Sequence, residues 1–261
     1  MKILITGVSS GIGLSLAGLF QKEEVWGLSR RSPPEHLSVR FNSCDVTDWQ
    51  QLLDAGDQIG TEWGVLDAVI HCAGTQGTIG PAVDVDPLEW ARTVRENIEG
   101  AYFVIRAFLP LLTRTAGLRA KVLLFSGGGA SYGRPNFSAY ACAKTGLVRL
   151  VETLAIEWRG LPIDINILAP GSINTGMTHE ILELGPEVAG DDEYKRALQQ
   201  LENGGDSLEK VLSMVRFLVS NESDGISGRF ISAQWDDQRR LMSAIREINH
   251  RDAFKLRRIV P

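Results

Sequence analysis

The chain has few cysteines, no long apolar run and no excess of basic charge. Its 261 residues include only three cysteines, without CxxC spacing, so the sequence predicts neither a disulfide framework nor a metal site. No stretch has the length of a secretory signal or a membrane span. The net charge of -5 gives no electrostatic reason to expect a nucleic acid or a membrane as partner. These absences favour a cytoplasmic protein that acts on a small molecule.

What is present is the pattern of a single α/β domain. Apolar runs, several of them continuous as in strands buried on both faces, alternate with helical patterns. The predicted strands lie near 2–6, 25–28, 37–41, 67–72, 121–126, 163–168 and 229–232. The predicted helices lie near 12–22, 48–59, 88–112, 138–159 and 208–219, the fourth with Ser138 as N-cap. This order predicts a Rossmann-type doubly wound parallel sheet with helices on both faces.

Two regions depart from the alternation. Residues 174–206 have little apolar periodicity and are interpreted as an irregular lid within a domain that spans 1–237. The acidic residues of this lid suit a hydroxylated substrate, and a solvated loop explains them equally well; they are Glu180, Glu183, Glu187, Asp191 and Asp192. Residues 238–261 read as a helical C-terminal extension, for which packing or subunit contact is favoured over phosphate binding.

A glycine-rich turn follows the first predicted strand and reads Thr6-Gly7-Val8-Ser9-Ser10-Gly11-Ile12-Gly13. Glycines allow a sharp turn, a close approach of the backbone to a pyrophosphate, and tight packing of helix on strand. The N–H groups at the start of the next helix then face the phosphates. An ordinary strand-to-helix turn is the alternative, but the strand–turn–helix context favours a dinucleotide site.

The second predicted strand ends at Ser29-Arg30-Arg31, where folds that prefer NAD often place an acidic residue on the adenine ribose. Arg30 can instead pair with a 2′-phosphate, so NADP(H) is favoured over NAD(H). Two solvated surface arginines are the alternative interpretation.

Tyr140 and Lys144 are spaced four residues apart on a predicted helix, so their side chains share one face. A phenol titrates near 10, and an adjacent ammonium is expected to lower that pKa toward the range of general acid/base catalysis. Tyr140 would then exchange a proton with a carbonyl or alcohol oxygen. A surface helix pair is the alternative.

In this combination the sequence resembles the short-chain dehydrogenase/reductase family over about residues 1–235. The resemblance rests on six segments in the family's order: 6–13, Cys44-Asp45-Val46, His71-Cys72-Ala73-Gly74, Asn97, the Tyr140/Lys144 pair, and Pro170-Gly171-Ser172-Ile173-Asn174-Thr175.

The resemblance implies a role for each of these segments. Lys144 would hold the nicotinamide ribose, Asn97 would support a water relay to Lys144, and Asp45 would contact the adenine. Together with Arg30 from the second strand, the predicted cofactor-binding residues are Gly7, Ser9, Ser10, Gly11, Ile12, Gly13, Arg30, Asp45, Val46, Ala73, Gly74, Tyr140, Lys144, Pro170, Gly171, Ile173 and Thr175. Taken alone, Asp45 reads as a turn residue and Asn97 as a helix cap. His71, at the end of a buried strand, is given no catalytic role.

One position departs from the family's pattern. The family carries a serine thirteen residues before the tyrosine, where this chain has Gly127. Ser126 is one place early, and neighbouring strand residues point to opposite faces. The glycine run could bend the strand so that Ser126 turns inward, could offer N–H groups to an oxyanion, or could make room for a bulkier substrate.

The sequence therefore predicts an NADP(H)-dependent oxidoreductase that interconverts a ketone and a secondary alcohol, with Tyr140, Lys144, Asn97 and Ser126 as catalytic residues. A dinucleotide-binding regulatory or scaffold protein with weak or no catalysis is the alternative, because of Gly127. A different reaction on a sugar or a nucleotide-linked sugar also stays open. The expected partners are a small carbonyl or alcohol compound and further copies of the chain, as a homodimer or homotetramer.

Overall fold

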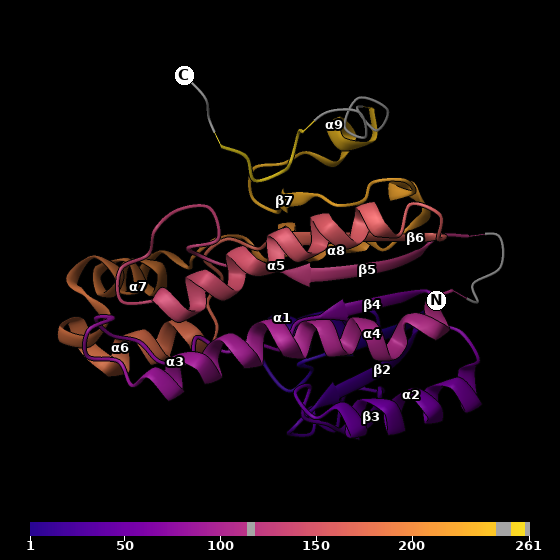
Figure 1. Cartoon of the computed structure of the whole chain (residues 1–261), viewed down its shortest axis with the longest axis horizontal. Helices are drawn as coiled ribbons and strands as arrows, with labels where there is room; N and C mark the ends of the chain where they lie inside the picture. Colours follow the sequence, from indigo (N-terminus) through magenta and orange to yellow (C-terminus); the bar gives the residue numbers. More distant parts are fainter. Residues whose placement is uncertain (114–117, 244–251, 259–261) are drawn as a thin grey trace.

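A computed structural model describes residues 1–113, 118–243 and 252–258. Within them a seven-stranded parallel sheet runs in the order β3-β2-β1-β4-β5-β6-β7 (Figure 1). The strands are β1 (Lys2–Thr6), β2 (Glu24–Ser29), β3 (Arg40–Ser43), β4 (Ala68–His71), β5 (Ala120–Phe125), β6 (Ile163–Ala169) and β7 (Phe230–Ser232). Each overlaps a predicted strand, so the predicted sheet is confirmed.

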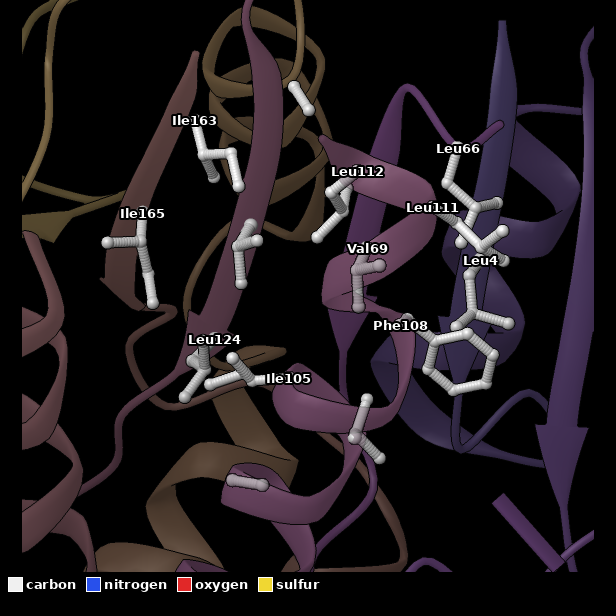
Figure 2. Close-up of a cluster of buried hydrophobic side chains, with 14 of the residues drawn as sticks. Leu4, Leu66, Val69, Ile105, Phe108, Leu111, Leu112, Leu124, Ile163 and Ile165 are labelled. Atoms are coloured by element: carbon white, nitrogen blue, oxygen red, sulfur yellow. The ribbon is translucent and has the colours of Figure 1, made fainter. Parts of the chain in front are cut away.

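Helices cover both faces of this sheet. They are α1 (Gly11–Leu19), α2 (Trp49–Trp63), α3 (Pro87–Val94), α4 (Gly100–Leu112), α5 (Ser138–Glu157), α6 (Gly176–Ala189), α7 (Asp191–Asn203), α8 (Leu208–Leu218) and α9 (Gln238–Ser243). One core lies between the sheet and α2, α4 and α5, where Figure 2 shows Phe108 of α4 close to Leu4 of β1. A second core joins α1 and α8 to the other face. The doubly wound arrangement is confirmed.

Successive strands are added toward one edge of the sheet from β1 to β3 and toward the other edge from β4 to β7. β1 pairs with β2 on one side and with β4 on the other, so the connections leave the two strands in opposite directions. Outside the carboxyl ends of such strands the loops separate, and this leaves a crevice in which ligands of α/β proteins bind.

The helical run predicted at 88–112 is continuous but not uniform. α3 is capped by the Asp86 carboxylate, which accepts from the N–H groups of Leu88 and Glu89. A π-helical turn, η1 (Arg95–Glu99), separates α3 from α4 and carries Asn97. One extra residue in a turn rotates the following side chains, and such turns occur often at functional sites.

Two local predictions were wrong. Ser138 does not cap α5: the N-cap position is Phe137, without a side-chain cap bond, and the Ser138 hydroxyl accepts from Trp90 Nε1 at 3.0 Å. Residues 174–206 are not irregular, because α6 and α7 account for most of them. α7 presents a narrow apolar face with Ala197 buried, and its acidic first turn suits the positive end of the helix dipole.

The predicted C-terminal extension is described only in part. α9 begins at Gln238 as expected, and the next residues, 244–251, lie outside the described part of the chain, as do 259–261. Residues 252–258 lie against β7, where the Phe230 N–H donates to the Phe254 carbonyl at 2.8 Å. Across the described ranges, no helix has the length and apolarity to cross a membrane. The same residues contain no group of three or more His, Cys, Asp or Glu side chains placed to hold a metal ion.

Candidate active site

The glycine-rich turn between β1 and α1 is built for close backbone packing. Gly7 has φ +75°, and a Cβ there would lie 2.9 Å from the Ala73 nitrogen. A Cβ at Gly13 would lie 2.3 Å from the Gly7 carbonyl oxygen. The Ser10 side chain does not cap α1, so the first N–H groups of this helix stay available to a ligand.

A cavity of about 430 Å³ opens at this turn, and we name it the turn cavity. Its walls come from the loops that follow β1, β2, β3, β4 and β6. The predicted residues that line it are Gly7, Ser9, Ser10, Gly11, Ile12, Gly13, Arg30, Asp45, Val46, Ala73, Gly74 and Thr175. Residues that the sequence reasoning missed also line it, among them Ser29, Thr47, Thr75 and Glu96.

Charges of both signs line the turn cavity. Arg30 and Arg31 line it together with Asp45, whose carboxylate accepts from the N–H and the hydroxyl of Thr47 at 2.9 and 2.8 Å. Burial raises the pKa of Asp45, but the hydrogen bonds from Thr47 and the charge of Arg30 outweigh it, so the pKa lies below its ordinary value. Asp45 is thus an ionised turn residue that borders the cavity.

A second cavity of about 220 Å³ adjoins the first and contains Tyr140; we name it the tyrosine cavity. The two cavities share wall residues, which are Ile12, Cys72, Gly74, Thr175 and Met177. Of the predicted residues, it is lined by Ile12, Gly74, Ser126, Tyr140, Lys144, Pro170, Gly171, Ile173 and Thr175. A ligand at the glycine turn would therefore lie next to the cavity that contains the phenol.

Tyr140 and Lys144 lie on one face of α5, with Lys144 Nζ 5.5 Å from the centroid of the Tyr140 ring. Burial raises the pKa of Tyr140 to about 12, against a smaller lowering by Arg134. The prediction that Lys144 makes the phenol more acidic was wrong for this structure. Burial removes water from the phenol and disfavours its charged form, and this effect is larger than that of any nearby charge. The cation that acts on the pKa of Tyr140 is Arg134. Burial also lowers the pKa of Lys144 to about 8.

Lys144 and Asn97 meet at Gly74. Lys144 Nζ donates to the Phe125 carbonyl at 3.1 Å. The Asn97 amide donates to the Thr75 and Thr93 carbonyls at 2.9 Å, and its buried Oδ1 has no partner among the described residues. A Cβ at Gly74 would lie 2.9 Å from that oxygen and 3.6 Å from Lys144 Nζ. Asn97 lines neither cavity and sits behind Gly74, a site that suits an ordered water.

The end of β5 explains the missing serine. A Cβ at Gly127 would lie 2.3 Å from the Tyr140 hydroxyl and 3.0 Å from its Cζ. The phenol thus occupies the space that a side chain at position 127 would need. Ser126 lines the tyrosine cavity, and its buried hydroxyl has no partner among the described residues.

The lid supplies one wall of the tyrosine cavity through Thr178, Ile181, Glu193, Arg196, Ala197 and Gln200. The sequence reasoning missed all of them, as well as Arg134 in the loop before α5. An amphipathic reading of 191–203 would have placed Glu193 and Ala197 on one buried face. Of the five acidic residues predicted to matter, Glu180 lines the turn cavity, and the other four are exposed and line neither cavity.

His71 takes no part in either cavity lining. Its Nδ1 lies 2.9 Å from the Thr6 hydroxyl, which also accepts from the N–H groups of Cys72 and Ala73. Burial, with a contribution from Lys144, lowers the pKa of His71 to about 3, so the ring is neutral. Thr6 and His71 together fix the start of the Ala73-Gly74 segment.

Comparison with known proteins identifies the family. A protein-family profile described as Enoyl-(Acyl carrier protein) reductase matches residues 7–234. The chain belongs to the short-chain dehydrogenase/reductase family of NAD(P)-dependent oxidoreductases.

Particular relatives cover the chain to different extents. The chain is 26% identical over 242 residues to the 3-oxoacyl-[acyl-carrier-protein] reductase FabG of Thermotoga maritima, covering 87% of this chain and 94% of that reductase. It is 30% identical over 253 residues to the short chain dehydrogenase tazN of Aspergillus terreus, covering 90% of this chain but only 52% of that protein.

Solved structures show the same fold. The ligand-free aldohexose dehydrogenase of Thermoplasma acidophilum superposes with a TM-score of 0.78 at 24% identity, covering 89% of this chain and 92% of that one. A short-chain dehydrogenase/reductase of Saccharomyces cerevisiae reaches a TM-score of 0.80 at 24% identity, covering 89% and 95%.

Proposed function

We propose that the protein is an NADP(H)-dependent oxidoreductase that interconverts a ketone and a secondary alcohol, with Tyr140 as the general acid/base. The observation that carries the proposal is that Tyr140 and Lys144 line a cavity that adjoins the cavity of the glycine turn and shares wall residues with it. The small size of the tyrosine cavity favours a small carbonyl compound over a bulky one.

The residues of the turn cavity fit a dinucleotide. A Cβ at Gly7 or Gly13 would collide with the backbone of Ala73 or Gly7, so the tight turn depends on both glycines, and the uncapped start of α1 leaves N–H donors for a pyrophosphate. A bound nicotinamide supplies or accepts the hydride in this family. Arg30 lies at the cavity end where a 2′-phosphate is expected, which supports NADP(H) over NAD(H).

The protonation of the site favours reduction. With its pKa raised to about 12, Tyr140 keeps its proton at neutral pH and is ready to donate it to a carbonyl oxygen as negative charge develops there. Lys144, with a pKa of about 8, is mostly an ammonium at pH 7. In this proposal Lys144 holds the nicotinamide ribose, and protons reach the phenol by way of Lys144 and a water held by Asn97.

The developing oxyanion needs donors other than a serine at position 127. The Ser126 hydroxyl is the first candidate, because a buried hydroxyl without a partner costs about 1–3 kcal/mol that a bond to substrate oxygen would offset. Loss of one such donor slows turnover about 10²–10³-fold. Ser126→Ala tests this role. We also infer a homodimer or homotetramer, by analogy with the family's subunit contacts.

The decisive experiment measures NADPH oxidation with a panel of small ketones, beside Tyr140→Phe. We expect binding of NADPH by both proteins and turnover by the wild type alone, with a loss of at least about 10²-fold in the variant. Tyr102→Phe, on the exposed side of α4, is the matched control and should keep its activity. Binding without turnover in both proteins would instead favour a regulatory or scaffold protein.

A further inference from the structure

A buried ion pair joins the lid to the loop that precedes the catalytic helix. Arg134 donates from Nε and Nη2 to one carboxylate oxygen of Glu193 in α7, at 3.0 and 2.7 Å. Both side chains are only 11% exposed. An ion pair with so little solvent around it is screened weakly. Glu193 also accepts from the more exposed Arg196 at 2.9 Å and so keeps one cation when Arg134 is removed, whereas removing Glu193 leaves Arg134 without this carboxylate.

Arg134 is also packed against the tyrosine. Its guanidinium lies 3.7 Å from the centroid of the fully buried Phe137 ring and 5.8 Å from that of Tyr140. The two rings form a small core with apolar residues of the lid, which are Ile181, Ala189 and Ala197. A guanidinium can stack on a ring and bind a carboxylate at its edge at the same time, which an ammonium cannot.

A second bond holds the same two segments together. The Asn136 side chain donates to the Val188 carbonyl at 3.0 Å, at the end of α6. Asn136 has φ 65°, a left-handed conformation that asparagine tolerates better than most residues. The side chains of Arg134 and Asn136 therefore both bond the loop before α5 to the lid, and of these two only Arg134 carries a charge.

We propose that Arg134 is a positioning residue for the reaction proposed above: clamped by Glu193, it holds the lid against Tyr140 and keeps a positive charge beside the phenol ring. This inference rests on the proposed function for its kinetic part. The titratable and charged groups around the Tyr140 side chain are Cys72, Tyr132, Arg134, Lys144, Glu193 and Arg196. Among them Arg134 is the cation that acts on the pKa of Tyr140, lowering it against the effect of burial.

The charges of the pair make opposite predictions for its two halves. Removing the cation with Arg134→Gln should raise the apparent pKa of Tyr140 by about one pH unit. Removing the anion with Glu193→Gln leaves the cation uncompensated and should lower that pKa. A residue with a merely structural role would not shift the pKa in opposite directions upon loss of either partner.

The kinetic test follows alcohol oxidation with NADP⁺ between pH 7 and pH 10, where the rate rises with the fraction of phenolate. At a fixed pH, Arg134→Gln should be about tenfold slower than wild type, and Glu193→Gln should be faster. Arg134→Lys should recover part of the loss, because it restores the charge. Arg216→Gln is the matched control, since Arg216 lies 5.9 Å from the Phe20 ring in a remote part of the chain.

A second measurement does not need turnover. Amide hydrogen exchange of α6 and α7 should be faster in Arg134→Gln than in wild type, because the clamp on the lid is lost. Unchanged exchange would overturn the clamp, whether or not the protein is active. Profiles of Arg134→Gln and Glu193→Gln that move in the same direction would overturn the effect on acidity, while Tyr140→Phe separately tests the proposed function.

Discussion

Restoring the family's serine at position 127 should damage this protein. A Cβ there would lie 2.3 Å from the Tyr140 hydroxyl, and an ordinary contact is at least 3.4 Å. The phenol must therefore move by about 1 Å, and displacements of that size in a catalytic group cost about 10²-fold in rate. Overpacking of a buried site destabilises a protein by about 1–3 kcal/mol. We expect Gly127→Ser to lose both activity and stability.

The assay combines kcat/KM for ketone reduction with the free energy of unfolding. Gly133→Ser is the matched control, because a Cβ at Gly133 meets nothing within 4 Å. In a Tyr140→Phe background, Gly127→Ser should cost less stability, since the hydroxyl that it collides with is gone. A Gly127→Ser variant that is faster than wild type and equally stable would refute the reasoning, because the serine would then fit beside the phenol.

Three further outcomes are expected. Arg30→Ala should lower the ratio of kcat/KM for NADPH over NADH at least about tenfold, and an unchanged ratio would remove Arg30 from 2′-phosphate recognition. His71, with its pKa lowered to about 3, contributes stability that is full above pH 6.5 and is lost as the pH falls toward 3, by at most about 5 kcal/mol. His71→Gln should flatten this part of the curve of unfolding free energy against pH, and an equal slope in both proteins would contradict it. Lys121 is 2% exposed and lies 2.9 Å from Asp164, which also pairs with Arg119, so Lys121→Met should destabilise the protein by about 1.5–3 kcal/mol. Arg92→Met at an exposed pair should cost less than about 1 kcal/mol, and equal losses in chemical unfolding would argue against the burial effect.

Local sequence patterns predicted the sheet and most of the turn cavity. Continuously apolar strands can only be buried on both faces, and glycines that must pack against backbone stand at fixed places in a strand–turn–helix unit. These features depend on neighbours in sequence, so Gly7, Gly13 and the strand positions were predictable. The lid was not predicted, because α7 is mostly polar and buries only Glu193 and Ala197, so few apolar residues mark it as a helix.

The sequence by itself determined which chemical groups are present: a phenol and an ammonium one helical turn apart, and a glycine where the family has a serine. Only the tertiary structure decided what those groups do to one another. It buried Tyr140 beside Gly127, so desolvation raises the pKa of the phenol and its hydroxyl takes the space of the missing side chain. It also brought Glu193 to Arg134 across 59 residues of chain, a contact that depends on long-range packing and on no local pattern.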